Sequence, residues 1–287
     1  MKKFVYVAVL TLALVTVACG KKEETEEKNQ PIVEEPVDED TPNGIEDGYV
    51  EEGILDEITA EPGEIQIAYE DFSDQITGDG DILLLSVSEH VPVVEIQGQE
   101  EIASKINEFF QERHSSFLND VEAARSVSQE VYDSYSQENI DSFEGFSIGQ
   151  TYEVLYQSEK FLCMEETQYE WLGSTHPSTF VSSFVFDLQT GEKVLLKEIV
   201  ENDEEAQTFV ADYIEQLIKE NYDPEGFYEE YEELLPGLYA DDIFYLNEKG
   251  VVFISNAYAI APYAAGKMEF VIPYEDFTLL KEEYSLL

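Results

Sequence analysis

Two stretches of helical periodicity, each flanked by strand-like segments, constrain the fold of this chain more than any other feature of its sequence. After Gly98, apolar residues recur at offsets close to three, four and seven, namely at Ile102, Ile106, Phe109, Phe110, Phe117, Leu118 and Val121. A second stripe, which Asn202 or Asp203 can cap, consists of Ala206, Phe209, Val210, Tyr213, Ile214, Leu217 and Ile218. Because each stripe occupies one side of its helix, we expect two amphipathic helices that pack against sheets.

The segment between the two helices is typical of antiparallel strands. Residues 146–171 are rich in aromatic and β-branched side chains. Phe180, Phe184 and Phe186 then alternate with smaller residues, and Gly191 supplies the left-handed position of a turn. These residues predict a pair of strands followed by a hairpin.

Further strands are expected on either side of this region. Residues 65–67 predict the start of a short strand, and residues 82–96 predict one or two strands broken near Pro92. Residues 243–272 predict three strands, whereas residues 227–235 predict a short acidic helix. Strands and helices thus alternate irregularly along the chain.

This order of elements predicts an α+β fold. We expect two small modules, residues 63–170 and 171–287, each with an antiparallel sheet packed by amphipathic helices.

The N-terminus predicts export. Lys2 and Lys3 precede an uncharged apolar run from Phe4 to Val17, the pattern of a secretory signal. A helix of about 14 residues spans only about 21 Å, short of the ~30 Å hydrocarbon core of a membrane. We therefore expect residues 1–18 to be a cleaved signal peptide and not a permanent transmembrane helix.

The residues around the predicted cleavage site resemble the bacterial lipobox. Ala18 precedes Cys19 and Gly20, although Thr16 stands where lipoproteins usually have leucine. The resemblance implies that Cys19 is acylated and becomes the first mature residue, which would anchor the chain in the outer face of the cell membrane. Ordinary secretion with cleavage beside Ala18 is the first alternative, and an uncleaved anchor in which Cys19 is only a small apolar residue is the second.

The charge of the chain is strongly negative, with 64 acidic and 15 basic residues. Residues 19–62 are acidic, poor in apolar runs and contain four spaced prolines, which predicts a disordered, extended tether. Residues 62–287 still carry a net charge of −38. Such a surface excludes nucleic acid as a partner and attracts cationic proteins. The alternative is that the charge confers only solubility, or adaptation to a salty or acidic habitat.

The sequence offers little evidence of catalysis. It contains no nucleotide fingerprint, no nucleophile elbow and no cysteine and histidine cluster with metal-ligand spacing. If Cys19 is lipidated, Cys163 has no disulfide partner and is interpreted as a buried small hydrophobe. His114, beside Arg113 on the first helix, is expected at the surface. We predict no enzyme activity, catalytic residue, cofactor or metal.

One loop combines aromatic and small residues in an unusual way. It runs from Tyr258 to Gly266 and includes Pro262 and Tyr263. Such a loop can present rigid aromatic anchors to a ligand, or it can pack on the helices while Gly266 permits a tight turn. We take Tyr258, Pro262, Tyr263 and His176 as the candidate ligand-binding residues.

Several motifs resemble the extracytoplasmic region of the lysozyme-responsive anti-sigma-V factors of Firmicutes. They are His176-Pro177 followed by Phe186 to Lys193, the run Gly250 to Phe253, the loop Tyr258 to Gly266, and Ile272-Pro273-Tyr274. In that family two modules of unknown function occur together, and they correspond here to residues 64–170 and 171–287. The first module also precedes some polysaccharide deacetylases.

The chain departs from that family at its N-terminus. The anti-sigma factors have a cytoplasmic sigma-binding segment before a membrane-spanning helix, and here a lipoprotein signal stands in place of both. The resemblance therefore implies ligand binding outside the cell and not sigma inhibition. We expect a lipid-anchored, non-enzymatic binding module for lysozyme or another cationic wall hydrolase, acting as sensor, decoy or inhibitor. The alternative is a module that binds cell-wall polysaccharide or assists a deacetylase.

Overall fold

The computed structural model describes residues 64–135 and 143–285, so Cys19 and the expected tether lie outside the described residues. The described residues form a five-stranded sheet, a three-stranded sheet and the helices that pack on them. This confirms the predicted α+β class. Within these ranges no helix is both long and apolar enough to cross a membrane.

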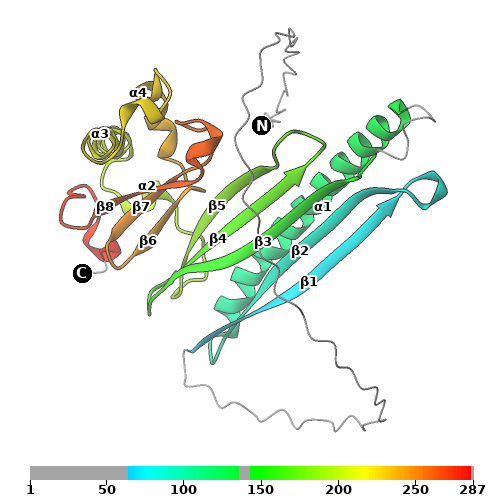
Figure 1. Ribbon diagram of the computed structural model, residues 1–287. Helices are drawn as coiled ribbons and strands as arrows, with labels where there is room; N and C mark the ends of the chain where they lie inside the picture. Colours follow the sequence, from blue (N-terminus) through cyan, green and yellow to red (C-terminus); the bar gives the residue numbers. More distant parts are fainter. Residues whose placement is uncertain (1–63, 136–142, 286–287) are drawn as a thin grey trace, which may run out of the picture. The chain divides into compact units, whose positions relative to one another are not determined.

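The five strands of the larger sheet lie in the order in which they occur along the chain (Figure 1). They are β1 (Ile65–Thr77), β2 (Leu83–Ile96), β3 (Phe146–Gln157), β4 (Phe161–Trp171) and β5 (Ser178–Asp187). Neighbours are antiparallel except β2 and β3, which are parallel. The helix α1 (Glu100–Ser134) joins these two strands and returns the chain to the end where β2 began. The prediction of an antiparallel sheet therefore fails for this one pair.

The predicted first helix covers one face of this sheet (Figure 1). Near its start, Ala103, Ile106 and Phe110 pack with Leu162 and other residues of one core cluster. Farther along, Phe117, Val121 and Ala124 pack with residues of β2 and β3 in a second cluster. The sequence periodicity thus identified the buried side of α1 correctly except at Leu118, which is exposed.

The strand β2 continues through Pro92, where the sequence predicted a break. Its register with β1 is unbroken from Ile65 to Ile76. The buried side chains on the α1 side nevertheless change from odd positions, ending at Val91, to even positions, beginning at Val94. Pro92 therefore marks a shift in which side chains face α1, and pairing with β1 holds the strand together. The same pairing extends β1 to 13 residues, well beyond the short strand expected.

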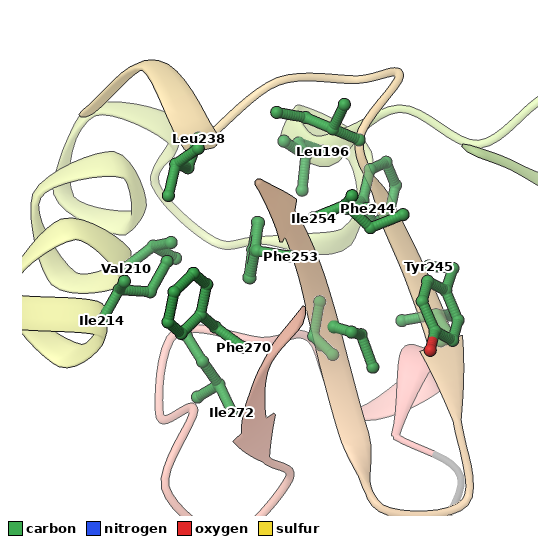
Figure 2. Close-up of a cluster of buried hydrophobic side chains, with 14 of the residues drawn as sticks. Leu196, Val210, Ile214, Leu238, Phe244, Tyr245, Phe253, Ile254, Phe270 and Ile272 are labelled. Atoms are coloured by element: carbon green, nitrogen blue, oxygen red, sulfur yellow. The ribbon is translucent and has the colours of Figure 1, made fainter. Parts of the chain in front are cut away.

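The smaller sheet is antiparallel and contains β6 (Phe244–Asn247), β7 (Gly250–Ser255) and β8 (Met268–Pro273). The helix α3 (Asp203–Asn221) packs Val210 and Ile214 toward Phe253 and Phe270 of this sheet (Figure 2). The Asn202 side chain accepts a hydrogen bond from the Glu205 N–H (3.3 Å) and caps this helix, as predicted.

Short helices complete the second region. They are α2 (Leu196–Ile199) and α4 (Tyr231–Leu234), together with single 3₁₀ turns at Asp79–Asp81, Pro224–Gly226, Leu235–Leu238, Tyr263–Ala265 and Glu282–Tyr284. The predicted acidic helix is thus one α-turn followed by a 3₁₀ turn, because Pro236 follows closely. After β5 the expected hairpin is reduced to one bridge between Phe186 and Lys193, although Gly191 has the predicted positive φ of 75°.

The two sheets share one hydrophobic core. Phe161 and Cys163 of β4 point away from α1 and pack in the same cluster as Phe244 and Phe253 of the smaller sheet. The Cys163 thiol donates to the Leu246 carbonyl (3.3 Å), and burial raises its pKa to about 12. The larger sheet also continues past residue 170, the expected module boundary, because β5 pairs with β4 along its length.

Candidate functional site

The structure brings three of the four predicted ligand-binding residues together. His176 lies in the loop between β4 and β5, and its ring stacks on that of Tyr263 with 5.1 Å between ring centroids and 15° between planes. The Tyr258 ring lies against the other tyrosine at 5.5 Å and 32°. We call His176, Tyr258 and Tyr263 the aromatic platform. Pro262 immediately precedes Tyr263, is exposed, and takes part in none of these ring contacts.

The loop that carries the tyrosines is both buried and exposed. Ile260 and Ala261 are buried in or beside the core, and the Ile260 carbonyl accepts from the Tyr228 N–H (3.1 Å). Tyr258, by contrast, is 60% exposed and has a positive φ of 67°, an uncommon conformation for a residue with a side chain. Both interpretations of this loop therefore hold for different residues: Ile260 and Ala261 anchor it, and Tyr258 faces outward.

Asn256 fixes this loop to the larger sheet. Its side-chain amide donates to the Val181 carbonyl (2.8 Å), and its side-chain oxygen accepts from the Val181 N–H (2.7 Å). One side chain thus satisfies both outward backbone groups of a residue on β5, and it is itself buried. This contact holds the tyrosine loop beside the β4–β5 hairpin that carries His176.

A second group of polar residues lies beneath α1 and was not predicted. We call it the polar cluster, and it consists of Glu89, Arg113, His114, Gln150, Tyr152, Glu166 and Gln168. The Arg113 guanidinium binds both carboxylate oxygens of Glu166, with 2.8 Å from Nε to Oε2. Tyr152 also donates to this carboxylate (2.8 Å). These contacts join α1 to β3 and β4 within the core.

The other half of the polar cluster contains Glu89 and His114. Their nearest side-chain atoms, Oε2 and Nδ1, are 2.5 Å apart, and Gln150 donates to the second oxygen of Glu89 (3.1 Å). The prediction that His114 lies at the surface is wrong, because only 24% of its side chain is exposed and its ring packs edge-on against Phe72. Burial raises the pKa of Glu89, and the hydrogen bond with His114 opposes this rise.

The buried groups of the polar cluster are paired by hydrogen bonds. Within residues 64–135 and 143–285, every buried side-chain nitrogen and oxygen has a hydrogen-bond partner. The same ranges contain no group of three or more histidine, cysteine, aspartate or glutamate side chains that could hold a metal ion. The arrangement is suited to fixing α1 on the sheet.

The sequence did contain a signal for this cluster. Arg113 and His114 fall on the apolar stripe of α1, between Phe110 and Phe117. Glu166 continues the alternation of buried residues that begins with Leu162 and Met164 in β4. A charged residue at a core position of both elements predicts a buried ion pair, provided that the two elements are known to meet.

The raised pKa of Glu89 predicts a pH dependence of stability. Because the folded chain binds this proton more tightly than the unfolded chain does, the free energy of unfolding should decrease as pH rises from about 4.5 through the raised pKa. Glu89→Gln should reduce that slope, measured by urea unfolding between about pH 4 and pH 7. Glu159→Gln, at an exposed position, serves as control. An unchanged slope in Glu89→Gln would assign the dependence to other carboxyls with raised pKa values, such as Glu165 and Glu170.

Two family models match separate parts of the chain. Residues 80–179 match the model of deacetylase PdaC, and residues 197–275 match that of a protein of unknown function, DUF3298. None of the curated proteins compared with the chain matches it. Paired regions of this kind agree with the expectation of two modules that also occur with deacetylases.

Solved structures resemble the chain in fold. A DUF3298 family member from Bacteroides fragilis has 15% identity and a TM-score of 0.57, and the match covers 78% of this chain and 96% of that chain. A DUF3298 family protein from Pseudomonas aeruginosa has 17% identity and a TM-score of 0.49, with 78% and 97% covered. At 15% identity, the first match shows a shared fold.

The aromatic platform draws on both matched regions. His176 lies near the end of the part that matches PdaC, whereas Tyr258 and Tyr263 lie in the DUF3298 part. The stack between His176 and Tyr263 therefore joins the two regions at the molecular surface. The chain combines a region similar to deacetylase PdaC with a region similar to DUF3298, and one candidate site is built from both.

Proposed function

We propose that this chain is a lipid-anchored cell-surface protein that binds a cationic protein, lysozyme or another cationic wall hydrolase, through the aromatic platform. The observation that carries the proposal is the stack of exposed His176 on half-buried Tyr263, with exposed Tyr258 beside it, on an acidic protein. Binding would let the chain act as a sensor, decoy or inhibitor outside the cell. Acylation of Cys19 would keep it at the membrane.

The geometry of the platform supports a protein ligand. Tyrosines are frequent binding anchors because a large rigid ring contributes contact area with little loss of side-chain entropy. Here the backbone is fixed as well, by the buried Ile260 on one side and by Asn256 on the other. A platform held in place before binding loses less conformational entropy when a ligand arrives.

The charge of the chain supports a cationic ligand. Residues 62–287 carry a net charge of −38, which accelerates encounter with basic proteins at low salt. Lysine and arginine side chains can also lie over tyrosine rings and gain cation–π attraction. Charge would thus bring the ligand to the surface, and the platform would select it.

The proposed role is binding and not catalysis. The platform rings contact one another and contain no carboxylate or thiol, and each buried side-chain nitrogen and oxygen of the polar cluster has a hydrogen-bond partner. A ligand-binding surface needs neither a nucleophile nor a general base.

The test is biolayer interferometry of residues 57–287, a compact unit, against lysozyme, with cytochrome c as an equally basic control. Selective binding of lysozyme that persists at about 0.3 M salt, where exposed charges are strongly screened, would support a shaped interface. Equal binding of both proteins that disappears with salt would reduce the interaction to nonspecific attraction.

Tyr263→Ala should weaken lysozyme binding roughly tenfold or more, equivalent to about 1.4 kcal/mol or more, because this ring contacts both other platform residues. Tyr222→Ala removes a tyrosine that is 42% exposed and lies outside the platform, and it should leave binding unchanged. Circular dichroism of both variants controls for folding. Normal affinity in a folded Tyr263→Ala variant would remove the platform from the interface.

The second candidate is a wall-polysaccharide ligand, favoured by the match of residues 80–179 to deacetylase PdaC. Aromatic rings stack on sugar faces through contacts that salt does not screen. Retention on purified peptidoglycan at about 0.5 M salt, lost in Tyr263→Ala, would favour this candidate over the protein ligand.

A further inference from the structure

The strand β1 leaves one side of the larger sheet open. It pairs with β2 along its inner side, and among the described residues nothing pairs with its outer side (Figure 1). The opposite edge strand, β5, is different, because its outward backbone groups have partners: Val181 binds the Asn256 side chain, Ser183 donates to the Asp242 carbonyl, and Val185 accepts from the Val194 N–H.

The direction of the β1 backbone follows from a contact on β2. Val94 donates its N–H to the Asn107 side chain and accepts from the same side chain (both 2.8 Å), so its backbone groups point away from β1. In an antiparallel pair, two directly opposed residues either hydrogen-bond to each other or both direct their backbone groups away from each other. Ile67 lies opposite Val94, so its N–H and C=O point outward from the sheet. Ile67 also packs on the α1 side, and farther along β1 the residues on that side are Phe72 and Ile76. Because the face of a side chain and the direction of its backbone groups alternate together, the outward backbone groups there belong to the even positions. The 13 residues of β1 thus present an edge about 40 Å long, at ~3.4 Å per residue.

Proteins usually protect such an edge by making the strand short or by placing a proline, lysine or bulge in it. β1 contains no proline and no lysine, and its register with β2 is continuous from Ile65 to Ile76. Its charged residues are Glu70, Asp71 and Asp74, and it has no basic residue. Neighbouring residues point to opposite faces of a sheet, so acidic groups lie on both faces along this edge.

These charges decide which strand can be added. A second copy of β1 would place like charges opposite or diagonal to one another, which is unfavourable. Residues 20–61 of this chain carry 16 acidic and 3 basic residues and are disfavoured for the same reason. A basic strand would satisfy the backbone and neutralise the carboxylates, and its cations could lie over Tyr69, which is 42% exposed.

We propose that the outer edge of β1 binds an extended peptide segment rich in lysine or arginine by β-strand addition. The edge is formed by residues other than the aromatic platform, so the proposal stands or fails independently of it. Backbone hydrogen bonds would supply affinity, and Glu70, Asp71 and Asp74 would select the charge.

The test uses the chain from residue 20 onward and a fluorescein-labelled peptide of about 12 residues in which lysine and valine alternate. Fluorescence anisotropy should show saturable binding, at least tenfold tighter than for a glutamate–valine peptide. Amide hydrogen exchange should show new protection at Ile67 and Phe72, whose N–H groups point outward. Binding without protection of β1, or equal affinity for both peptides, would overturn the proposal.

A matched pair of variants isolates the backbone contribution. Ile67→Pro removes a single outward N–H and proline is tolerated on edge strands, whereas Ile67→Ala shortens the same side chain but keeps the N–H. We expect at least tenfold weaker peptide binding in the proline variant than in the alanine variant. Equal affinity of the two would contradict strand addition. Tyr263→Ala should bind the peptide normally, which separates failure of this proposal from failure of the platform.

Discussion

Replacing Arg113 with methionine is expected to lower the free energy of unfolding by about 3–5 kcal/mol, the usual cost of leaving one partner of a buried ion pair alone. Glu166, which is 1% exposed, would lose both contacts with the guanidinium and keep the Tyr152 hydroxyl as a donor. Urea unfolding followed by the fluorescence of Trp171 measures the change. This residue is the one tryptophan of the sequence.

The double variant Arg113→Met and Glu166→Met tests the reason for this loss. Replacing both partners with apolar residues of similar size removes the unpaired charge, so stability should return to near the original value. Arg125→Met serves as a control, because Arg125 and Glu122 form an exposed pair on the same helix, and such pairs contribute little. If Arg113→Met lowered the free energy of unfolding no more than Arg125→Met, the ion pair between Arg113 and Glu166 would not stabilise the fold.

The helices and most strands could be predicted because their signals are local. The stripe from Ile102 to Val121 needs only the period of a helix, and α3 starts at the cap that Asn202 suggested. The parallel pairing of β2 and β3 was not predictable in this way. It depends on where the chain returns after 35 residues of helix, which no local pattern encodes.

The candidate site was predicted in composition but not in geometry. Alternating tyrosine and small residues indicated exposure of Tyr258, whereas the stack of Tyr263 on His176 requires the loop after β7 to reach β5. That arrangement depends on Asn256, which binds Val181 75 residues earlier in the chain. The polar cluster was not predicted for the same reason, because Arg113 and Glu166 are separated by 53 residues and meet only after the sheet has formed.

The shared core has a consequence for how the two matched regions depend on each other. Phe161 and Val185 belong to the larger sheet but pack among Phe244, Phe253 and Ile254 of the smaller one. Ser183 adds hydrogen bonds to the Phe244 carbonyl (2.8 Å) and the Asp242 carbonyl (2.7 Å). Neither sheet can bury this face without the other, so we expect residues 64–285 to unfold as one cooperative unit.

Phe253→Ala tests this dependence, because Phe253 is fully buried in β7 while Trp171 ends β4. The variant should lose about 3–5 kcal/mol of unfolding free energy, the usual cost of removing a buried phenylalanine ring. Trp171 fluorescence and far-ultraviolet circular dichroism should report the same shifted transition. Phe161→Ala, which opens the same core from the other sheet, should behave alike. If the Trp171 transition stayed in place while circular dichroism showed early loss of the smaller sheet, the two regions would fold separately. The platform that joins His176 to Tyr263 would then depend on the docking of two independent parts.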